Sequence, residues 1–173
     1  MTILTTERLV LTPVAVSDFD DLMALWSDPE FTQAIARRGP FSTEEVWFRL
    51  LRDLGHWQAL GRGNWAMRMK DTGVYVGSVG VLHYRRNCES PMEGPELGWG
   101  LGKPYQGQGL AREGVEAALD WTDTVLDAPR TVCMIDPGNA PSLKLAGRLG
   151  YRTYAEAQYN DHTVLLLERH RPG

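Results

Sequence analysis

The spacing of apolar and polar residues predicts strands and helices that alternate along the chain. Residues 8–14 and 65–70 alternate between apolar and polar side chains, as half-buried strands do. The turn residues 71–73 follow the second of these segments, and a glycine-interrupted apolar run then occupies residues 74–84. We therefore expect residues 65–70 and 74–84 to form an antiparallel hairpin.

Two capping signals predict helices in the first third of the chain. Residues 17–20 resemble a helix N-cap and precede the helical apolar spacing of residues 22–26. Residues 42–45 match the S-x-x-E capping box, in which the serine and the glutamate satisfy each other's free backbone amides. This second helix is expected to continue to about Leu54, with Gly55 helping to end it.

The second half of the chain is predicted to alternate between strands and helices before a closing hairpin. The expected elements are a strand at 96–101, a helix ending near 126, a strand at 131–135, a helix after 141, and strands at 151–158 and 163–168. The hairpin turn between the last two strands is placed at Asn160-Asp161.

These elements define the fold class. Antiparallel strands come early, and a strand-helix-strand-helix unit lies in the middle, which indicates an α+β or mixed α/β domain. No linker, repeat or tract poor in apolar residues interrupts the 173 residues. We therefore expect a single domain over residues 1–173, which is long enough to bury a substantial core.

Composition and charge exclude several classes of partner. The chain is 43% apolar and 23% charged, which is ordinary for a soluble globular protein. No apolar run approaches the length of a membrane span, and the first ten residues lack the layout of a signal peptide, so we expect a cytoplasmic protein without a membrane partner. A net charge of −4 and only short basic clusters predict no nucleic-acid partner.

No metal site is expected from the cysteines and histidines. Cys88 and Cys133 lie far apart and outside any CxxC pairing, which indicates reduced thiols and no zinc site. The four histidines share no metal-ligand spacing and are interpreted as structural or exposed.

Two glycines directly before a helix make residues 106–111 the clearest candidate for a binding site. The first turn of a helix has four backbone N–H groups without internal partners and a partial positive charge, so an anion binds there favourably. Gly107 and Gly109 allow the backbone to curl until successive amides point into one concavity. The sequence therefore predicts a phosphate-binding loop at this helix.

Three phosphate-binding motifs differ in their spacing, and only one fits. A P-loop requires a lysine and a hydroxyl after its last glycine, but Leu110 and Ala111 follow Gly109. A dinucleotide fingerprint requires glycine or alanine where Arg112 stands. The pattern [RQ]-x-x-G-x-[GA] is met by residues 106–111. Here the chain resembles the GNAT superfamily of N-acetyltransferases, in which this loop holds the pyrophosphate of acetyl-CoA.

The resemblance extends over nearly the whole chain. Four further segments follow in family order, at residues 6–11, 96–99, 139–142 and 148–151. They look like the RimJ/RimL-type branch, which includes ribosomal-protein N-terminal acetyltransferases and enzymes of other specificity. The resemblance implies a GNAT-like mixed sheet of about seven strands flanked by helices. Its strands at 96–101 and 131–135 would splay apart around acetyl-CoA.

The resemblance also implies which residues contact the cosubstrate. The thioester carbonyl would bond to backbone amide within residues 99–101, and Asn139 would bond either the pantetheine arm or the catalytic helix. A simple turn residue is the alternative for Asn139. The full predicted set is Trp99, Gly100, Leu101, Gln106, Gly107, Gln108, Gly109, Leu110, Ala111, Arg112, Asn139 and Ser142.

The implied reaction is direct attack of a neutral amine on the thioester carbonyl in a ternary complex, with expulsion of CoA thiolate. An amine near pH 7 is mostly protonated, so a proton acceptor is needed, and Glu96 matches the family position for a base acting through water. A strand cap or a surface ion pair is the alternative role for Glu96.

The leaving thiolate needs a proton donor. Many family members use a tyrosine, but Ala146 occupies that position here. In the RimJ/RimL-like branch a serine serves instead, and Ser142 falls at its position. The alternative is that Ser142 is simply a first-turn helix residue beside Pro141.

Several alternatives remain open at the level of sequence. A non-catalytic CoA-binding regulatory module would lose the groups at Glu96 and Ser142, which are both present. A GNAT enzyme using another acyl-CoA, an acceptor that is either a protein N-terminus or a small-molecule amine, and a homodimer all stay open. Among the tryptophans we expect Trp26, Trp47 and Trp121 in the core, whereas Trp57 and Trp65 are weaker candidates for the acceptor pocket.

Overall fold

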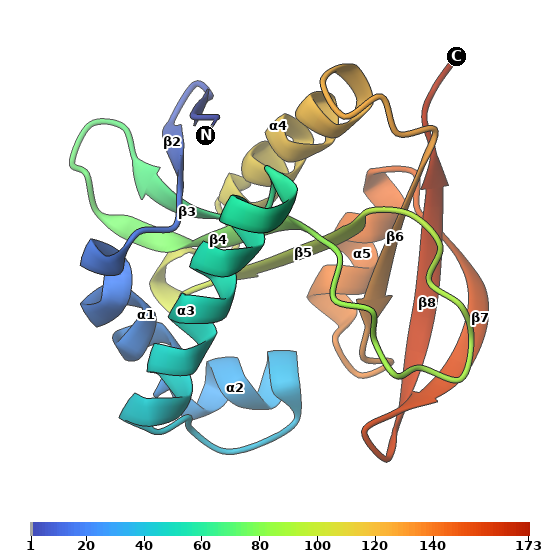
Figure 1. Cartoon of the computed structure of the whole chain (residues 1–173), viewed down its shortest axis with the longest axis horizontal. Coiled ribbons are helices and arrows are strands. Elements are labelled where there is room, and N and C mark those ends of the chain that lie inside the picture. Colours follow the sequence, from blue (N-terminus) through green and yellow to red (C-terminus); the bar gives the residue numbers. More distant parts are fainter. Residues whose placement is uncertain (1) are drawn as a thin grey trace.

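One mixed β-sheet forms the centre of the molecule in the computed structural model, which describes residues 2–173 (Figure 1). Its strands are β1 (Leu4–Thr5), β2 (Leu9–Pro13), β3 (Asn64–Met69), β4 (Tyr75–Leu82), β5 (Glu96–Leu101), β6 (Arg130–Ile135), β7 (Arg152–Tyr159) and β8 (His162–His170). Their order across the sheet is β1-β2-β3-β4-β5-β6-β8-β7, and the β5–β6 pair is parallel whereas the other neighbours are antiparallel.

The mixed α/β class is confirmed, with one correction to the strand number. The sheet within residues 2–173 has eight strands, not about seven. The additional strand is β1, whose two residues pair with Val10 and Leu11 at the sheet edge. A two-residue strand is too short to show an alternating pattern in the sequence.

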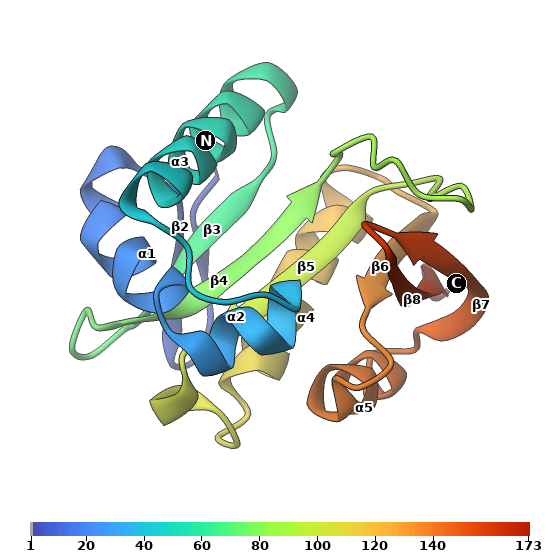
Figure 2. The same ribbon diagram turned by 90° about the horizontal axis from the view of Figure 1, so that it is seen from below.

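Helices cover both faces of the sheet (Figures 1 and 2). They are α1 (Phe19–Trp26), α2 (Pro29–Ala36), α3 (Thr43–Leu60), α4 (Leu110–Thr124) and α5 (Ala140–Arg148). Helices α1 to α3 bury apolar side chains such as Leu25 and Leu50 on one face. On the opposite face Val115 of α4 and Ala146 of α5 belong to a second apolar cluster.

Two helix predictions need correction. Helix α3 does not end at Gly55 but continues to Leu60, and Gly61 closes it with a left-handed φ of 65°. A glycine inside a helix costs roughly 1 kcal/mol, which burial of His56 and Trp57 in the following turn offsets. Helix α2 was not expected, although Asp28 caps it through hydrogen bonds from the N–H groups of Glu30 and Phe31.

The tryptophans also differ from expectation. Trp26 and Trp121 are buried as predicted, but Trp47 is 38% exposed. Trp57 and Trp65 are 3% and 0% exposed, and they contact each other edge to face with ring centroids 5.0 Å apart. They therefore belong to the apolar core and not to an acceptor pocket.

Strands β5 and β6 splay apart, as the resemblance implied. They share a single register pair, Glu96 with Val132, next to the hydrogen bond that Val132 N–H donates to the Pro95 carbonyl (2.9 Å). Beyond this point β6 continues to pair with β8 while β5 continues to pair with β4 (Figure 2). The space between the diverging strands positions the candidate site.

Candidate active site

A cleft of about 740 Å³ opens beside the diverging strands. Its lining comes from α2, the end of β5, the loop before α4 with the first turn of that helix, the loop after β6, and α5. Of the predicted site residues it brings together Trp99, Gly100, Leu101, Gln106, Gly107, Gly109, Leu110, Ala111, Arg112, Asn139 and Ser142. Gln108 and Glu96 lie outside this lining.

The loop before α4 has the geometry of an anion cradle. Gly107 and Gly109 adopt left-handed φ angles of 74° and 79°, which side chains with a Cβ rarely adopt. Glu113 N–H donates to the Gly109 carbonyl (3.1 Å) and is the first intrahelical donor, so the N–H groups of Leu110 to Arg112 have no acceptor within the helix. A backbone that turns free amides and the helix dipole towards the cleft fits a diphosphate group.

Arg8, the residue directly before β2, holds this loop from outside the cleft. Its Nη1 donates to the Gln108 carbonyl (2.9 Å), and its Nε donates to Oε2 of Glu113 (2.7 Å). The backbone N–H of Arg8 and the hydroxyl of Thr6 both donate to Oε1 of Glu113. These hydrogen bonds lower the pKa of Glu113 although burial opposes them. Because C=O and N–H point in opposite directions across a trans peptide, fixing the Gln108 carbonyl also fixes the Gly109 N–H.

Gln106 connects the same loop to β5. Its Nε2 donates to the Leu101 carbonyl (3.0 Å) at the end of the strand. Strand β5 pairs with β4 along one side and meets β6 only at Glu96. After Glu96, the N–H and C=O groups of β5 that point towards β6 are not paired with that strand and face the space between the two strands. These groups are the ones that the resemblance implies for the thioester carbonyl.

Asn139 caps the helix that carries Ser142. Its Oδ1 accepts a hydrogen bond from the Ser142 backbone N–H (3.2 Å), and its Nδ2 donates to the Ala34 carbonyl of α2 (3.4 Å). The geometry therefore places Asn139 as a partner of the α5 helix. Ser142 is half-buried and lines the cleft.

Glu96 lies at the point where β5 and β6 separate, and it is 7% exposed. Arg86 holds both of its oxygens: Nε donates to Oε1 (2.9 Å) and Oε2 (2.8 Å), and Nη2 donates to Oε1 (2.6 Å). Burial alone would lower the pKa of Arg86, but its hydrogen bonds to Glu96 and the charge of Glu96 outweigh burial and raise it. Glu96 is thus in an ion pair, although a buried one, and its role as a base stays a prediction.

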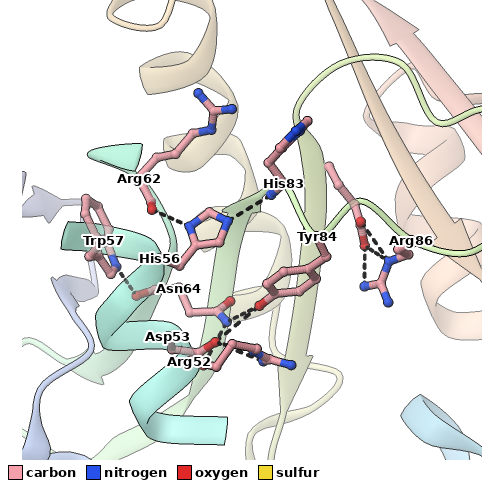
Figure 3. Close-up of polar contacts among 10 residues, drawn as sticks. Arg52, Asp53, His56, Trp57, Arg62, Asn64, His83, Tyr84 and Arg86 are labelled. Atoms are coloured by element: carbon pink, nitrogen blue, oxygen red, sulfur yellow. Dashed lines mark hydrogen bonds and ion pairs between the residues drawn. The ribbon is translucent and has the colours of Figure 1, made fainter. Parts of the chain in front are cut away.

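A polar cluster next to Glu96 was not found from the sequence (Figure 3). Tyr84 donates its hydroxyl hydrogen to Asp53 Oδ1 (3.2 Å), and Asn64 donates to Asp53 Oδ2 (3.0 Å). Burial, followed by the Asp53 charge, raises the pKa of Tyr84, so its hydroxyl stays protonated. Arg86 and Tyr84 follow the end of β4 in a segment with no distinctive motif, so no sequence signal marks them.

Neither a membrane helix nor a metal cluster occurs among residues 2–173. No helix in this range is long and apolar enough to cross a membrane. No group of three or more His, Cys, Asp or Glu side chains in the same range is placed to hold a metal ion.

Comparisons with known proteins identify the family. A model described as "Acetyltransferase (GNAT) domain" matches residues 8–152. The chain is 30% identical over 154 residues to "Uncharacterized N-acetyltransferase p20" of Bacillus licheniformis, covering 88% of this chain and 83% of that protein. It is 32% identical to a putative GnaT-family acetyltransferase from Bordetella pertussis, with a TM-score of 0.86 and coverage of 98% and 99% of the two chains.

The fold is also shared with ribosomal-protein acetyltransferases. RimL, a ribosomal L7/L12 α-N-protein acetyltransferase in complex with coenzyme A, is 17% identical, with a TM-score of 0.81 over 98% of each chain. The RimL likeness shows the shared mixed α/β fold, whereas the family model and the 30% identical relative define an acyltransferase. The chain belongs to the GNAT family of acetyltransferases, so the predicted family and enzyme class are confirmed.

Proposed function

We propose that this enzyme transfers an acetyl group from acetyl-CoA to a primary amine. The cleft beside the splayed strands carries the proposal, because it combines the glycine loop of α4, the unpaired side of β5 and Ser142 in one space of about 740 Å³. GNAT enzymes use acetyl-CoA, and the RimL structure contains coenzyme A. When bound, acetyl-CoA would supply an acyl group activated as a thioester.

The residues of the cleft have separate tasks in this proposal. The free amides of Gly109 to Arg112 would hold the diphosphate, and the backbone of Trp99 to Leu101 would orient the thioester carbonyl. Ser142 Oγ would donate a proton to the leaving sulfur. Asn139 would fix the position of Ser142 by capping α5.

Glu96 remains the proposed acceptor of the amine proton, with water as the carrier. Its Oε1 accepts two hydrogen bonds from Arg86 and its Oε2 accepts one. A carboxylate has about four acceptor positions, so Oε2 keeps one for a water molecule while the ion pair stays closed. The cytoplasmic location that the sequence leads us to expect stays part of the proposal, and a homodimer stays an open alternative.

Thermal unfolding with acetyl-CoA tests the binding part. We expect the melting temperature to rise with acetyl-CoA concentration, because a ligand at 100 times its Kd stabilises the folded state by about 2.7 kcal/mol. An acetyl thioester without the nucleotide, S-acetyl-N-acetylcysteamine, is the matched control and should give little shift. An unchanged melting temperature at millimolar acetyl-CoA would contradict the proposal.

Thiol release tests the chemistry. We expect free thiol to appear when acetyl-CoA is combined with an acceptor from a panel of peptides, amino acids and polyamines. Propionyl-CoA and succinyl-CoA in parallel assays decide the acyl preference. Binding of acetyl-CoA without thiol release for any acceptor would favour the regulatory-module alternative.

A further inference from the structure

The side of β5 that faces α1 to α3 is nearly bare. Side chains alternate along a strand, and Leu97 and Leu101 point into the cluster on the α4 side. Glu96, Gly98 and Gly100 therefore face the other helices. A Cβ at Gly100 would lie 2.9 Å from the ring of Phe31 in α2, and Phe31 also lines the cleft. This side of the strand thus extends from Glu96 to the cleft wall without bulky side chains.

Arginines surround this region. Arg52 of α3 and Arg86 each lie beside the Tyr84 ring, with their guanidinium carbons 4.5 Å and 5.1 Å from its centroid (Figure 3). Arg52 donates to Oδ1 of Asp53 (2.9 Å), and Arg86 is paired with Glu96. Each of these two guanidiniums therefore has its own carboxylate.

Arg49 of α3 is the third arginine. The charge of Asp53 acts on it, but Asp53 is already paired with Arg52, and Arg49 has no ion pair of its own in the part of the chain that the structure describes. Its guanidinium carbon lies 3.6 Å from the ring centroid of Trp26 and 5.3 Å from that of Phe41. Its Nε is buried and has no hydrogen-bond partner among residues 2–173. Burial, followed by repulsion from Arg52, lowers the pKa of Arg49 to about 10, so the side chain is still charged at neutral pH.

This arrangement is costly unless an anion completes it. Arg49 as a whole is partly exposed, but its buried Nε–H without a hydrogen-bond partner is unfavourable, because burial removes the water that would otherwise accept its hydrogen. Stacking on Trp26 holds the plane of the guanidinium and leaves its N–H edge for a partner. Trp26 also contacts Phe31, with ring centroids 5.1 Å apart, and the charge of Arg86 acts on Arg49. Arg49 therefore lies near the partner of Glu96, on the side of β5 that Gly100 faces.

We infer that the acceptor amine of this enzyme also carries a carboxylate, which binds the guanidinium of Arg49. The inference rests on the proposed acetyl transfer and names its substrate class. The three arginines carry three positive charges, and Asp53 and Glu96 supply two negative charges. One carboxylate on the acceptor would balance the third. The same positive charge disfavours the protonated form of a nearby amine, and this helps the amine to react as the neutral nucleophile.

Matched acceptor pairs test the inference. We compare kcat/KM for leucine with leucinamide, and for a peptide beginning Ser-Asp with one beginning Ser-Asn. The first pair probes an α-carboxylate and the second a side-chain carboxylate. We expect kcat/KM for the acceptor with the carboxylate to exceed kcat/KM for the neutral acceptor by about 10-fold or more in at least one pair. The reason is that hydrogen bonds to charged groups are among the strong ones.

Variants of Arg49 connect this preference to the site. Arg49→Met should remove the preference by lowering kcat/KM for the acid while leaving the neutral acceptor and the thermal shift with acetyl-CoA near wild type. Arg38→Met is the matched control, because Arg38 also stacks on Phe41 (4.1 Å) but is paired with Glu45 and 46% exposed. If Arg49→Met does not fold, Arg49→Lys is used, which keeps the charge but loses the planar donor pair and should weaken the preference.

The outcomes separate this inference from the proposed function. Equal rates for acid and neutral acceptors, or a preference that survives loss of the Arg49 guanidinium, would overturn the inference and leave acetyl transfer standing. Absence of thiol release with every acceptor, charged or neutral, would overturn both.

Discussion

At the scale of single residues, the start of α5 separates a structural role from a chemical one. Asn139 caps the helix by accepting a hydrogen bond from the backbone N–H of Ser142. The Ser142 hydroxyl takes no part in that cap and lines the cleft. Helix stability and proton donation therefore depend on different atoms, and mutation can test each one separately.

Ser142→Ala should lower kcat on the order of 100-fold, because loss of a general acid typically costs at least that much. The melting temperature and the KM for acetyl-CoA should stay near wild type, since the cap uses only backbone at Ser142. Steady-state kinetics measures kcat and KM, and thermal unfolding measures the melting temperature. Asn139→Ala is the control and should instead destabilise the fold by about 1 kcal/mol. An unchanged kcat in Ser142→Ala would mean that Ser142 is only a structural residue of helix α5.

At the scale of elements, the start of a strand far away in the sequence holds the loop before α4. Arg8, directly before β2, binds the Gln108 carbonyl and Glu113. The side chains of Arg8 and Glu113 are 42% and 16% exposed, so the ion pair itself stabilises the fold by no more than about 1 kcal/mol. Its larger effect is on the orientation of the Gln108–Gly109 peptide, and therefore on the anion cradle.

Arg8→Gln should raise the KM for acetyl-CoA by about 10-fold with little change in kcat, because the cradle loses one fixed N–H while the reacting groups stay in place. Arg130→Gln is the matched control. It removes an Arg–Glu ion pair with Glu168 (2.6 Å) that lies outside the cleft lining, and it should leave this KM unchanged. An unaltered KM in Arg8→Gln would show that the loop keeps its shape without the arginine.

At the scale of the whole molecule, α2 connects the two parts of the sheet across the cleft. Strands β5 and β6 share one register pair, and α2 contacts both sides of the gap. Phe31 packs on Gly100 of β5, whereas Arg37 forms an ion pair with Asp136 after β6 (2.8 Å). The width of the cleft therefore depends on α2 as well as on the sheet.

Arg37→Gln should speed amide hydrogen exchange in α2 by up to about fivefold, since a partly exposed ion pair contributes roughly up to 1 kcal/mol. Exchange in β3 to β5 should not change. Lys103→Gln is the control, because the Lys103–Glu30 pair also involves α2 but its side chains are 66% and 64% exposed. Equal exchange rates in both variants would mean that packing alone holds α2 in place.

The features that the sequence predicted correctly are those set by local physics. The capping box at Ser42 and the glycine loop before α4 depend on neighbouring residues, so their patterns are visible in the chain. Strand alternation and the order of elements follow from the same local rules. Helix α3 extends past Gly55 because burial of Trp57 outweighs a local preference. The helical spacing of Val46, Leu50 and Trp57 continues across the glycine, but the glycine itself predicts an end there.

The sequence by itself determined most of the strands and helices, the family motif and most of the predicted residues that gather at the cleft. Only the tertiary structure decided that Arg86 holds both oxygens of Glu96, that Arg8 holds the loop, and that the Nε of Arg49 has no hydrogen-bond partner within residues 2–173. The reason is physical: the energy of a charged group depends on the burial and on the charges around it. Packing brings these groups together from distant parts of the chain, as it brings Arg8 to Glu113, 105 positions later.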